Sequence, residues 1–186
     1  MTEKTDEQLI AEHDRGDENA FDSLVRRHLK TVYRLSFRIA GKEAAEDIVQ
    51  ETFLKVWKKF SSFRRSGNFK AWLLGIARNA AIDHLRKQKY PAYSEISESS
   101  ASTPEEFLLD DKPLQDEILD RAKTSEALVK VITKLPIRDR EILSLHYEND
   151  LTFDEIGKIL GRPLHTVKSL HHRALIALRK ILSSKK

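Results

Sequence analysis

The stretch that decides the fold is AAEDIVQETFLKVWKKF, residues 44–60. Its apolar residues recur at steps of three and four, the period of one face of an α-helix. They are Ile48, Val49, Phe53, Val56, Trp57 and Phe60. A second stripe, on the other side of the same helix, consists of Asp47, Gln50, Glu51 and Leu54. Core packing accounts for the first stripe, whereas the second has no role in a core.

Composition places the chain among folded proteins with a strongly charged surface. It has 186 residues, of which 40% are hydrophobic and 33% charged, enough for one larger domain or two small ones. The absence of cysteine excludes disulfides and thiolate metal sites. The polar start MTEKTDEQLIAEHD is no signal peptide, and no apolar run reaches the ~20 residues of a membrane span. We therefore expect a cytoplasmic protein without membrane insertion.

The net charge of +4 conceals an alternation along the chain. Residues 54–90 hold ten Lys or Arg and one acid, residues 91–120 hold nine acids and one Lys, and residues 161–186 hold seven Lys or Arg and no acid. A single basic block is equally well explained as a solvated helix face, but two blocks indicate two surfaces for polyanions.

Helix signals predict an all-α first domain over residues 1–90. Thr5 and Gln8 form a capping box, and Asp17 caps a longer helix that ends at Gly41. Residues 61–68 are predicted to be a loop, after which Asn68 caps a fourth helix. The inward residues of the second and fourth helices are predicted to be Phe21, Leu24, Val25, His28, Val32, Leu35, Ile39, Phe69, Trp72, Leu73, Ile76, Ala77 and Ala80.

A Ser-, Pro- and acid-rich segment, residues 91–123, separates this domain from a second one at residues 124–186. We expect that segment to be a flexible acidic linker. In the second domain, a capping box at Thr152–Glu155 opens a short helix that ends at Gly161, and a basic helix follows to about residue 182. This order predicts a helix-turn-helix. The predicted fold is thus all-α, with two small helical domains.

Catalytic and metal chemistry find no support in the sequence. It contains no Gly-rich phosphate loop, nucleophile elbow or paired carboxylates in an apolar run. His171 and His172 are adjacent, so on a helix they point about 100° apart and chelate poorly. We therefore predict no enzyme activity, no cofactor and no metal site.

Nucleic-acid binding agrees better with the residues. The last helix offers His165, Lys168, Ser169, His172 and Arg173 on its outward side, where they can reach bases and phosphates in a major groove. The basic block of the first domain is interleaved with aromatic residues, a mixture typical of single-strand binding. Because most of its rings lie on core stripes, only the loop at residues 61–68 is expected to be free, with Phe63, Arg64, Arg65 and Asn68.

Three stretches together resemble one family. AAEDIVQETFLKVW, FRRSGNFKAWLLGIARNAAIDHLRK and LPIRDREILSLHYENDLTFDEIGKILG, the last followed by a TVKS-type helix, are similar to bacterial RNA polymerase sigma factors of the extracytoplasmic-function (ECF) type. The similarity runs from about residue 6 to residue 182, in the family's order. It implies two helical domains, called regions two and four, joined by a linker that threads the RNA path of the polymerase.

The resemblance also assigns roles to residues. Asp47, Gln50, Glu51 and Leu54 match the positions that dock on a coiled coil of the largest catalytic subunit of core RNA polymerase. The loop at residues 61–68 and the helix after it match the part that captures a flipped base and opens the minus-ten promoter element; the outward residues of that helix are Lys70, Arg78, Asn79, Arg86 and Lys87. The last helix, with His165, Thr166, Lys168, Ser169, His172 and Arg173, matches the reader of the minus-thirty-five element. Sigma factors of this type usually have an anti-sigma partner.

Two departures concern the last helix. Leu170 stands where the family commonly has an arginine, and His171 where it has a core aliphatic residue, while His165 replaces a small residue. Two other functions are weighed against the sigma factor. A stand-alone helix-turn-helix regulator explains the last helix but leaves Asp47, Gln50 and Glu51 without a role. An adaptor without DNA binding predicts loss of the basic residues between 63 and 89, which are present.

Overall fold

The structure is a computed structural model and describes residues 4–63, 67–87 and 131–183. Throughout this part of the chain the regular structure is helical, which confirms the predicted all-α class. The elements are α1 (Asp6–Asp14), α2 (Glu18–Ala40), α3 (Lys42–Lys59), the 3₁₀-helix η1 (Phe60–Ser62), α4 (Phe69–Lys87), α8 (Ile137–Leu143), the π-helix η3 (Ser144–Glu148), α9 (Phe153–Leu160) and α10 (Leu164–Ser183). The predicted linker, residues 91–123, lies outside the described residues.

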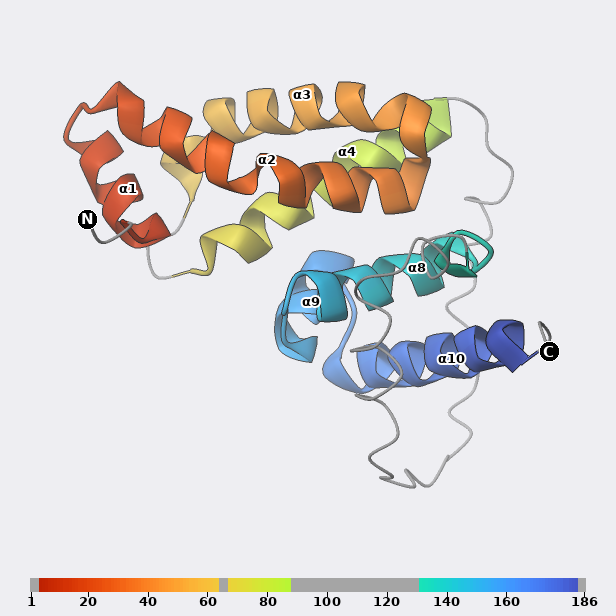
Figure 1. Ribbon diagram of the computed structural model, residues 1–186. Coiled ribbons are helices and arrows are strands. Elements are labelled where there is room, and N and C mark those ends of the chain that lie inside the picture. Colours follow the sequence, from red (N-terminus) through yellow and green to blue (C-terminus); the bar gives the residue numbers. More distant parts are fainter. Residues whose placement is uncertain (1–3, 64–66, 88–130, 184–186) are drawn as a thin grey trace.

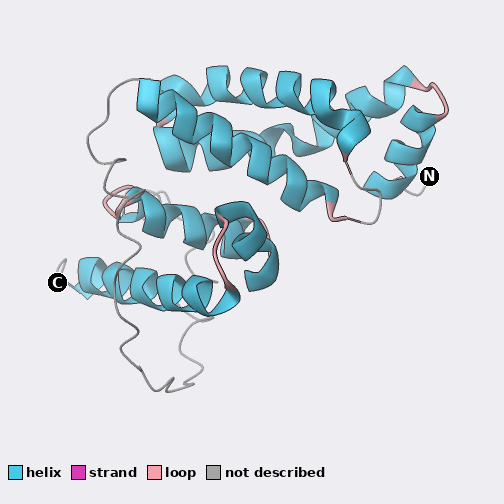
Figure 2. Ribbon diagram, turned by 180° about the vertical axis from the view of Figure 1, so that it is seen from behind, coloured by secondary structure: helices cyan, strands magenta, loops and turns pink. Residues whose placement is uncertain are grey.

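The helices form two layers (Figure 1). Helices α1 to α4 make an upper bundle in which α2, α3 and α4 run side by side, and α8, α9 and α10 make a smaller lower unit. The lower unit lies against α2 and α4, whereas α3 lies on the far side of the bundle, as the view from behind also shows (Figure 2). No helix in the described ranges is long and apolar enough to cross a membrane.

Helix ends lie where the sequence predicted them. Thr5 and Gln8 form the first capping box, and the Asp17 side chain accepts a hydrogen bond from the Asn19 amide at 3.0 Å. Thr152 and Glu155 form the second box, with the Thr152 amide donating to the Glu155 carboxylate at 2.9 Å. Caps of this kind pair amides that have no partner inside the helix. They therefore set the boundaries of α1, α2 and α9.

The first core stripe is buried almost as predicted. Ile48 and Val56 of α3 are fully inaccessible, and Leu24, Val32 and Leu35 of α2 pack in the same core. Burying such side chains stabilises a fold by about 1.5–3 kcal/mol each, so the α2–α3–α4 contact dominates the energetics of the bundle. The short helix α1 is held to α2 by Asp6, which accepts from Arg27 and contacts the His28 ring nitrogen, both at 2.7 Å.

The lower unit has its own apolar contacts around α10. Val167, Ala174 and Leu178 pack inward from α10 toward α8 and α9, together with Ile142 and Ile156. Gly161 ends α9 in the left-handed conformation at φ 63°, which a residue without a Cβ adopts readily. A capped short helix, a glycine turn and a longer helix form the predicted helix-turn-helix.

Candidate functional site

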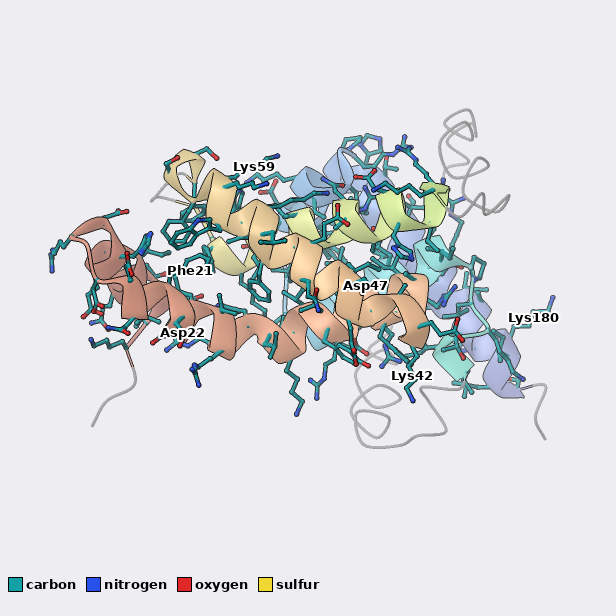
Figure 3. All side chains as sticks on the ribbon, turned by 90° about the horizontal axis from the view of Figure 1, so that it is seen from above. Phe21, Asp22, Lys42, Asp47, Lys59 and Lys180 are labelled. Carbon is teal, nitrogen blue, oxygen red and sulfur yellow. The ribbon has the colours of Figure 1, made fainter. Side chains whose placement is uncertain are left out.

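The second stripe of α3 is a solvent-facing surface. Asp47 and Gln50 are exposed, and Leu54 has 61% of its surface accessible although it is apolar. Figure 3 shows Asp47 on the face of the bundle formed by α2 and α3. The Glu51 carboxylate accepts from Lys55 at 2.8 Å, and this hydrogen bond lowers the pKa of Glu51. The stripe therefore presents two anionic groups, an amide and an apolar side chain on a rigid helix.

Trp57 belongs to this surface and not to the core, so the core prediction for it was wrong. Its side chain is 52% exposed, and it packs only at the rim of an aromatic cluster, edge-to-face with Phe21 at 4.8 Å between centroids. Trp57 lies four positions after Phe53 of the first stripe but also three positions after Leu54 of the second. The spacing from Leu54 could have indicated that Trp57 belongs to the second stripe. It enlarges the apolar part of the second stripe.

The loop after α3 differs from its prediction at Phe63. Phe63 is only 6% exposed, with its ring centroid 5.5 Å from that of Phe69 and 5.1 Å from that of Trp72. It is therefore a core residue that anchors the loop, and the prediction that its ring is free is wrong. Arg64 and Arg65 lie outside the described residues. Asn68 is exposed and caps α4 as predicted, accepting from the Ala71 amide at 3.2 Å.

The outward face of α4 carries most of its predicted polar residues. Asn79, Arg86 and Lys87 are exposed, and Lys70 is half-buried. Arg78 is the exception, because its guanidinium does not face solvent. It forms an ion pair through its Nε with Glu141 of α8, and its side chain keeps only 16% of its surface accessible.

The pairing of Arg78 belongs to a polar contact between the two layers. Arg38 of α2 donates from Nε and Nη2 to one carboxylate oxygen of Glu148, at 2.9 and 2.5 Å. Asn68 at the start of α4 donates to the Glu155 carboxylate at 2.6 Å. We call Glu141, Glu148 and Glu155 the acidic triplet of the lower unit. Each of its members reaches one polar side chain of the upper bundle.

Burial and pairing affect the acidic triplet unequally. Glu141 is 2% exposed, and this burial raises its pKa against the attraction of Arg78. Burial also raises the pKa of Glu155, but hydrogen bonds from Thr152 and Asn68 outweigh it, so the net pKa is lowered. Glu155 therefore serves two helices at once: it completes the capping box of α9 and holds the residue that caps α4.

The outward face of α10 is close to its prediction. His165, Lys168, Ser169, His172 and Arg173 are exposed, and Thr166 is half-buried. They lie along the first half of the helix, where a recognition helix meets base edges. The Ser169 hydroxyl donates to the His165 carbonyl at 3.0 Å, so in this state it is satisfied within the helix.

The two unusual residues of α10 are both buried. Leu170 is 7% and His171 5% exposed, so both belong to the inner face of the helix. The His171 ring nitrogen Nε2 contacts the Tyr147 hydroxyl at 3.0 Å. Burial, followed by the nearby His146 and His172, lowers the pKa of His171 from 6.5 to about 4. His171 is therefore a neutral core residue, and Leu170 packs where it cannot contact a phosphate.

The turn between α9 and α10 depends on Gly157. Its carbonyl accepts from the Arg162 amide at 2.9 Å, which brings the turn back onto α9. A Cβ at this position would lie 2.7 Å from the Arg162 carbonyl oxygen. Only glycine permits this approach, a feature that the sequence analysis did not identify.

The described residues contain no group of three or more His, Asp or Glu side chains that could hold a metal ion. The features that remain are an exposed mixed stripe on α3, basic and amide side chains on α4, and a polar face on α10. Each suits binding to a macromolecule.

Comparison with known proteins identifies the family. The model for sigma-70 region 2 matches residues 24–90, and that for sigma-70, region 4 matches residues 131–180. The ECF RNA polymerase sigma factor SigW of Bacillus subtilis (strain 168) is 34% identical over 171 residues, which cover 90% of this chain and 91% of SigW. The RNA polymerase sigma-H factor of Pseudomonas aeruginosa is 33% identical, with 98% of this chain and 96% of that protein covered.

A solved structure agrees with these relatives. The sigma factor RpoE of Bartonella quintana, crystallised with the anti-sigma factor NepR, superposes with a TM-score of 0.64 at 26% identity, and the match covers 89% of this chain and 98% of that one. Both sigma-70 regions are present in the family's order. The chain therefore belongs to the ECF sigma factors, which are not enzymes but direct promoter-specific initiation of transcription by bacterial RNA polymerase.

Proposed function

We propose that three segments of this sigma factor, residues 1–90, 91–123 and 124–186, have different functions. The first part binds core polymerase and opens the minus-ten element, the second is an acidic linker, and the third reads the minus-thirty-five element. The observation that carries the proposal is the second stripe of α3, an exposed mixed surface that neither the core nor the lower unit uses. A sigma factor needs such a surface, whereas a stand-alone regulator does not.

The second stripe supplies the polymerase contact. Asp47 and Glu51 pair with basic groups of the partner's coiled coil, while Gln50 adds hydrogen bonds and Leu54 is buried on docking. Such a mixture of central apolar and rim polar groups is typical of protein interfaces. Trp57 extends the apolar part, and exposed tryptophans are frequent anchors of interfaces.

The minus-ten contact comes from the loop before α4 and from the outward face of α4. Its residues are Arg64, Arg65, Asn68, Lys70, Arg78, Asn79, Arg86 and Lys87. The cations hold the phosphate backbone, and amides such as Asn79 bind unpaired bases. Opening the duplex requires no catalysis, because binding only the open state shifts the equilibrium toward it. Phe63 contributes indirectly, since its buried ring fixes one end of the loop.

The minus-thirty-five contact comes from α10, through His165, Thr166, Lys168, Ser169, His172 and Arg173. Lys168 and Arg173 supply phosphate or guanine contacts, and His165 and Ser169 read base edges. Because Leu170 is buried, the phosphate contact usual at that position is absent from this face. We infer a promoter preference that rests on the histidines more than is common in the family.

Regulation is proposed to follow the solved relatives. The sigma factor RpoE is seen with an anti-sigma factor, and by analogy we propose an anti-sigma partner for this chain. The linker carries nine acids among residues 91–120 and would occupy the RNA path of the polymerase, where its charge resembles that of RNA. The chain itself is proposed to act in the cytoplasm.

Run-off transcription tests the proposal. The protein is mixed with bacterial core polymerase and a pool of genomic fragments, and transcript starts are sequenced. We expect starts that share one minus-thirty-five and one minus-ten sequence. Starts that need the protein but share only a minus-ten sequence would contradict the role of α10. Polymerase binding without any dependent start would contradict the promoter contacts altogether.

A further inference from the structure

The junction between α2 and α8 holds two arginines with unpaired donors. Arg38 lies near the end of α2 and Arg140 lies in α8, and these two helices are in contact (Figure 1). Arg38 Nη1 and Arg140 Nε are both buried, and neither has a hydrogen-bond partner in the described part of the chain. Buried donors in native proteins nearly always have an acceptor, so two unpaired ones at one junction require an explanation.

The carboxylate that Arg38 reaches has no further capacity for this junction. Glu148 accepts from Arg38 Nε and Nη2 through Oε1, at 2.9 and 2.5 Å, and from the Ser144 hydroxyl through Oε2 at 2.7 Å. Both carboxylate oxygens of Glu148 are therefore engaged. One edge of the Arg38 guanidinium is paired, while its Nη1 atom is left without an acceptor.

The acids next to Arg140 on α8 interact with other arginines. Glu141 forms its ion pair with Arg78 of α4, and Asp139 is attracted to Arg138 and Arg173. Arg140 itself forms no ion pair with any residue that the structure describes. Its guanidinium is thus half-buried without an anionic partner.

Arg140 instead lies close to a like charge. Burial, and then the positive charge of Arg38, lower the pKa of Arg140. Both effects disfavour the cation, but a guanidinium keeps its proton near neutral pH and cannot escape the cost by becoming neutral. Two guanidiniums and the single carboxylate of Glu148 give the junction a net positive charge. An anion from outside the chain would remove this repulsion and supply the missing acceptors.

We propose that Arg38 and Arg140 form a binding site for a phosphate group at the junction of α2 and α8. A guanidinium presents its N–H donors in a planar fork that matches two oxygens of a phosphate. Arg38 donates from Nη1, and Arg140 donates from Nε and a neighbouring Nη atom. The Arg38 side chain is only 12% exposed, so the ligand enters from the side of the half-buried Arg140.

The donor set suits one small oxyanion. Two arginines, one of them already shared with Glu148, can hold a single phosphate group, whereas a nucleic-acid strand requires a row of cations along its backbone. The ligand is therefore inorganic phosphate or a phosphate monoester. Neither arginine belongs to the proposed polymerase or promoter contacts, so this site is a function beyond those proposed above. A bound phosphate stabilises the contact between α2 and α8, because it binds only where both arginines meet.

Titration of the full chain with inorganic phosphate tests the site. Affinity is measured by calorimetry, and stability by urea unfolding, while phosphate replaces chloride at constant ionic strength. The test variant is Arg140→Gln. The matched control is Arg179→Gln, which removes the same charge from an exposed position of α10. Phosphate also stabilises proteins by its exclusion from their surface, and the control variant accounts for this general effect.

We expect the wild type and Arg179→Gln to bind phosphate equally, and Arg140→Gln to bind it at least about tenfold more weakly, because a hydrogen bond to a charged group contributes a factor of this order. Without phosphate, Arg140→Gln should unfold at the same or a higher urea concentration than the wild type, since it removes a buried charge that has no partner. Absence of binding to the wild type, or equal affinities in Arg140→Gln and Arg179→Gln, would overturn the site.

Glycerol 3-phosphate distinguishes the two forms of the ligand. Binding as tight as that of inorganic phosphate, and lost in Arg140→Gln, would support a site for phosphate monoesters. Binding at least about tenfold weaker would support a site for the free ion, whose four oxygens all remain available to donors. Binding of the ester that Arg140→Gln leaves unchanged would overturn the assignment of the ester to these two arginines.

Discussion

At the residue scale, position 171 shows how a substitution in a family motif is absorbed. A histidine stands where an aliphatic residue is usual, and the structure keeps it neutral inside the core, against Tyr147 and close to the rings of His146 and Phe153. A neutral histidine has one N–H donor and one acceptor nitrogen, and its burial requires no counter-charge. The fold therefore tolerates His171 near neutral pH but not its protonation.

This predicts an acid-sensitive region 4. The pKa of His171 is lowered to about 4, so between about pH 6.5 and pH 4 the unfolded chain binds a proton that the folded chain does not. The free energy of unfolding is not reduced by this effect above pH 6.5. As the pH falls through the window, it decreases by up to about 3 kcal/mol. Urea unfolding followed by circular dichroism at pH 7.5 and pH 5 should show a larger loss for the wild type than for His171→Leu. Equal losses would contradict the assignment.

At the scale of elements, local signals account for nearly all of the helices. The capping residues Thr5, Asp17, Asn68 and Thr152 satisfy amides within three positions of themselves, so their effect is visible in the sequence. Trp57 and Phe63 were misassigned because each lies at the edge of a stripe or a loop. There, tertiary packing decides burial, and spacing alone does not.

The turn of the helix-turn-helix yields a prediction of its own. Gly157→Ala places a Cβ 2.7 Å from the Arg162 carbonyl oxygen, so the turn must move. Overpacking of this kind costs about 1–3 kcal/mol. We expect circular dichroism to show unfolding at a lower urea concentration, while tryptophan fluorescence is unchanged, because Trp57 lies in α3 and Trp72 in α4 of the upper bundle.

The control for Gly157→Ala is Gly75→Ala, whose Cβ would meet nothing closer than 3.7 Å. Run-off transcription should lose its dependence on the minus-thirty-five sequence in Gly157→Ala and keep it in Gly75→Ala. A Gly157→Ala protein as stable as the control would show that the turn can adjust at no cost.

At the scale of the whole molecule, the contact between the layers had no counterpart in the sequence analysis. Its partners are separated by 63, 87 and 110 residues, and no periodicity links positions so far apart. Arg78 was predicted to face DNA from its place on α4, a reasonable inference from one helix. Its pairing with Glu141 is visible only once the two units are packed together. The family itself could be identified because its motifs are local.

The proposed polymerase and DNA surfaces of region 2 lie on different helices, α3 and α4, so mutation can separate them. Asp47→Lys with Glu51→Lys should abolish co-purification with core polymerase, because it reverses two charges of the proposed docking stripe. The fold should persist, since Asp47 is exposed and Glu51 is half-buried, and the circular dichroism spectrum should be unchanged.

The matched control is Glu18→Lys with Asp22→Lys, which reverses two exposed acids at the same four-residue spacing on α2. It should bind polymerase normally. Retained binding in the Asp47 and Glu51 double variant would exclude the stripe as the docking surface. Lost binding in the control would show that net charge, and not position, is responsible.

The acidic triplet also bears on how a scarce factor moves through a cell. A genome offers about 10⁶–10⁹ non-specific sites, to which an open cationic helix would bind. Carboxylates that already pair with Arg78 and Asn68 leave fewer side chains of the proposed DNA contact free for such sites. Weaker non-specific binding of this kind would reduce the number of molecules that a cell must synthesise to activate its promoters.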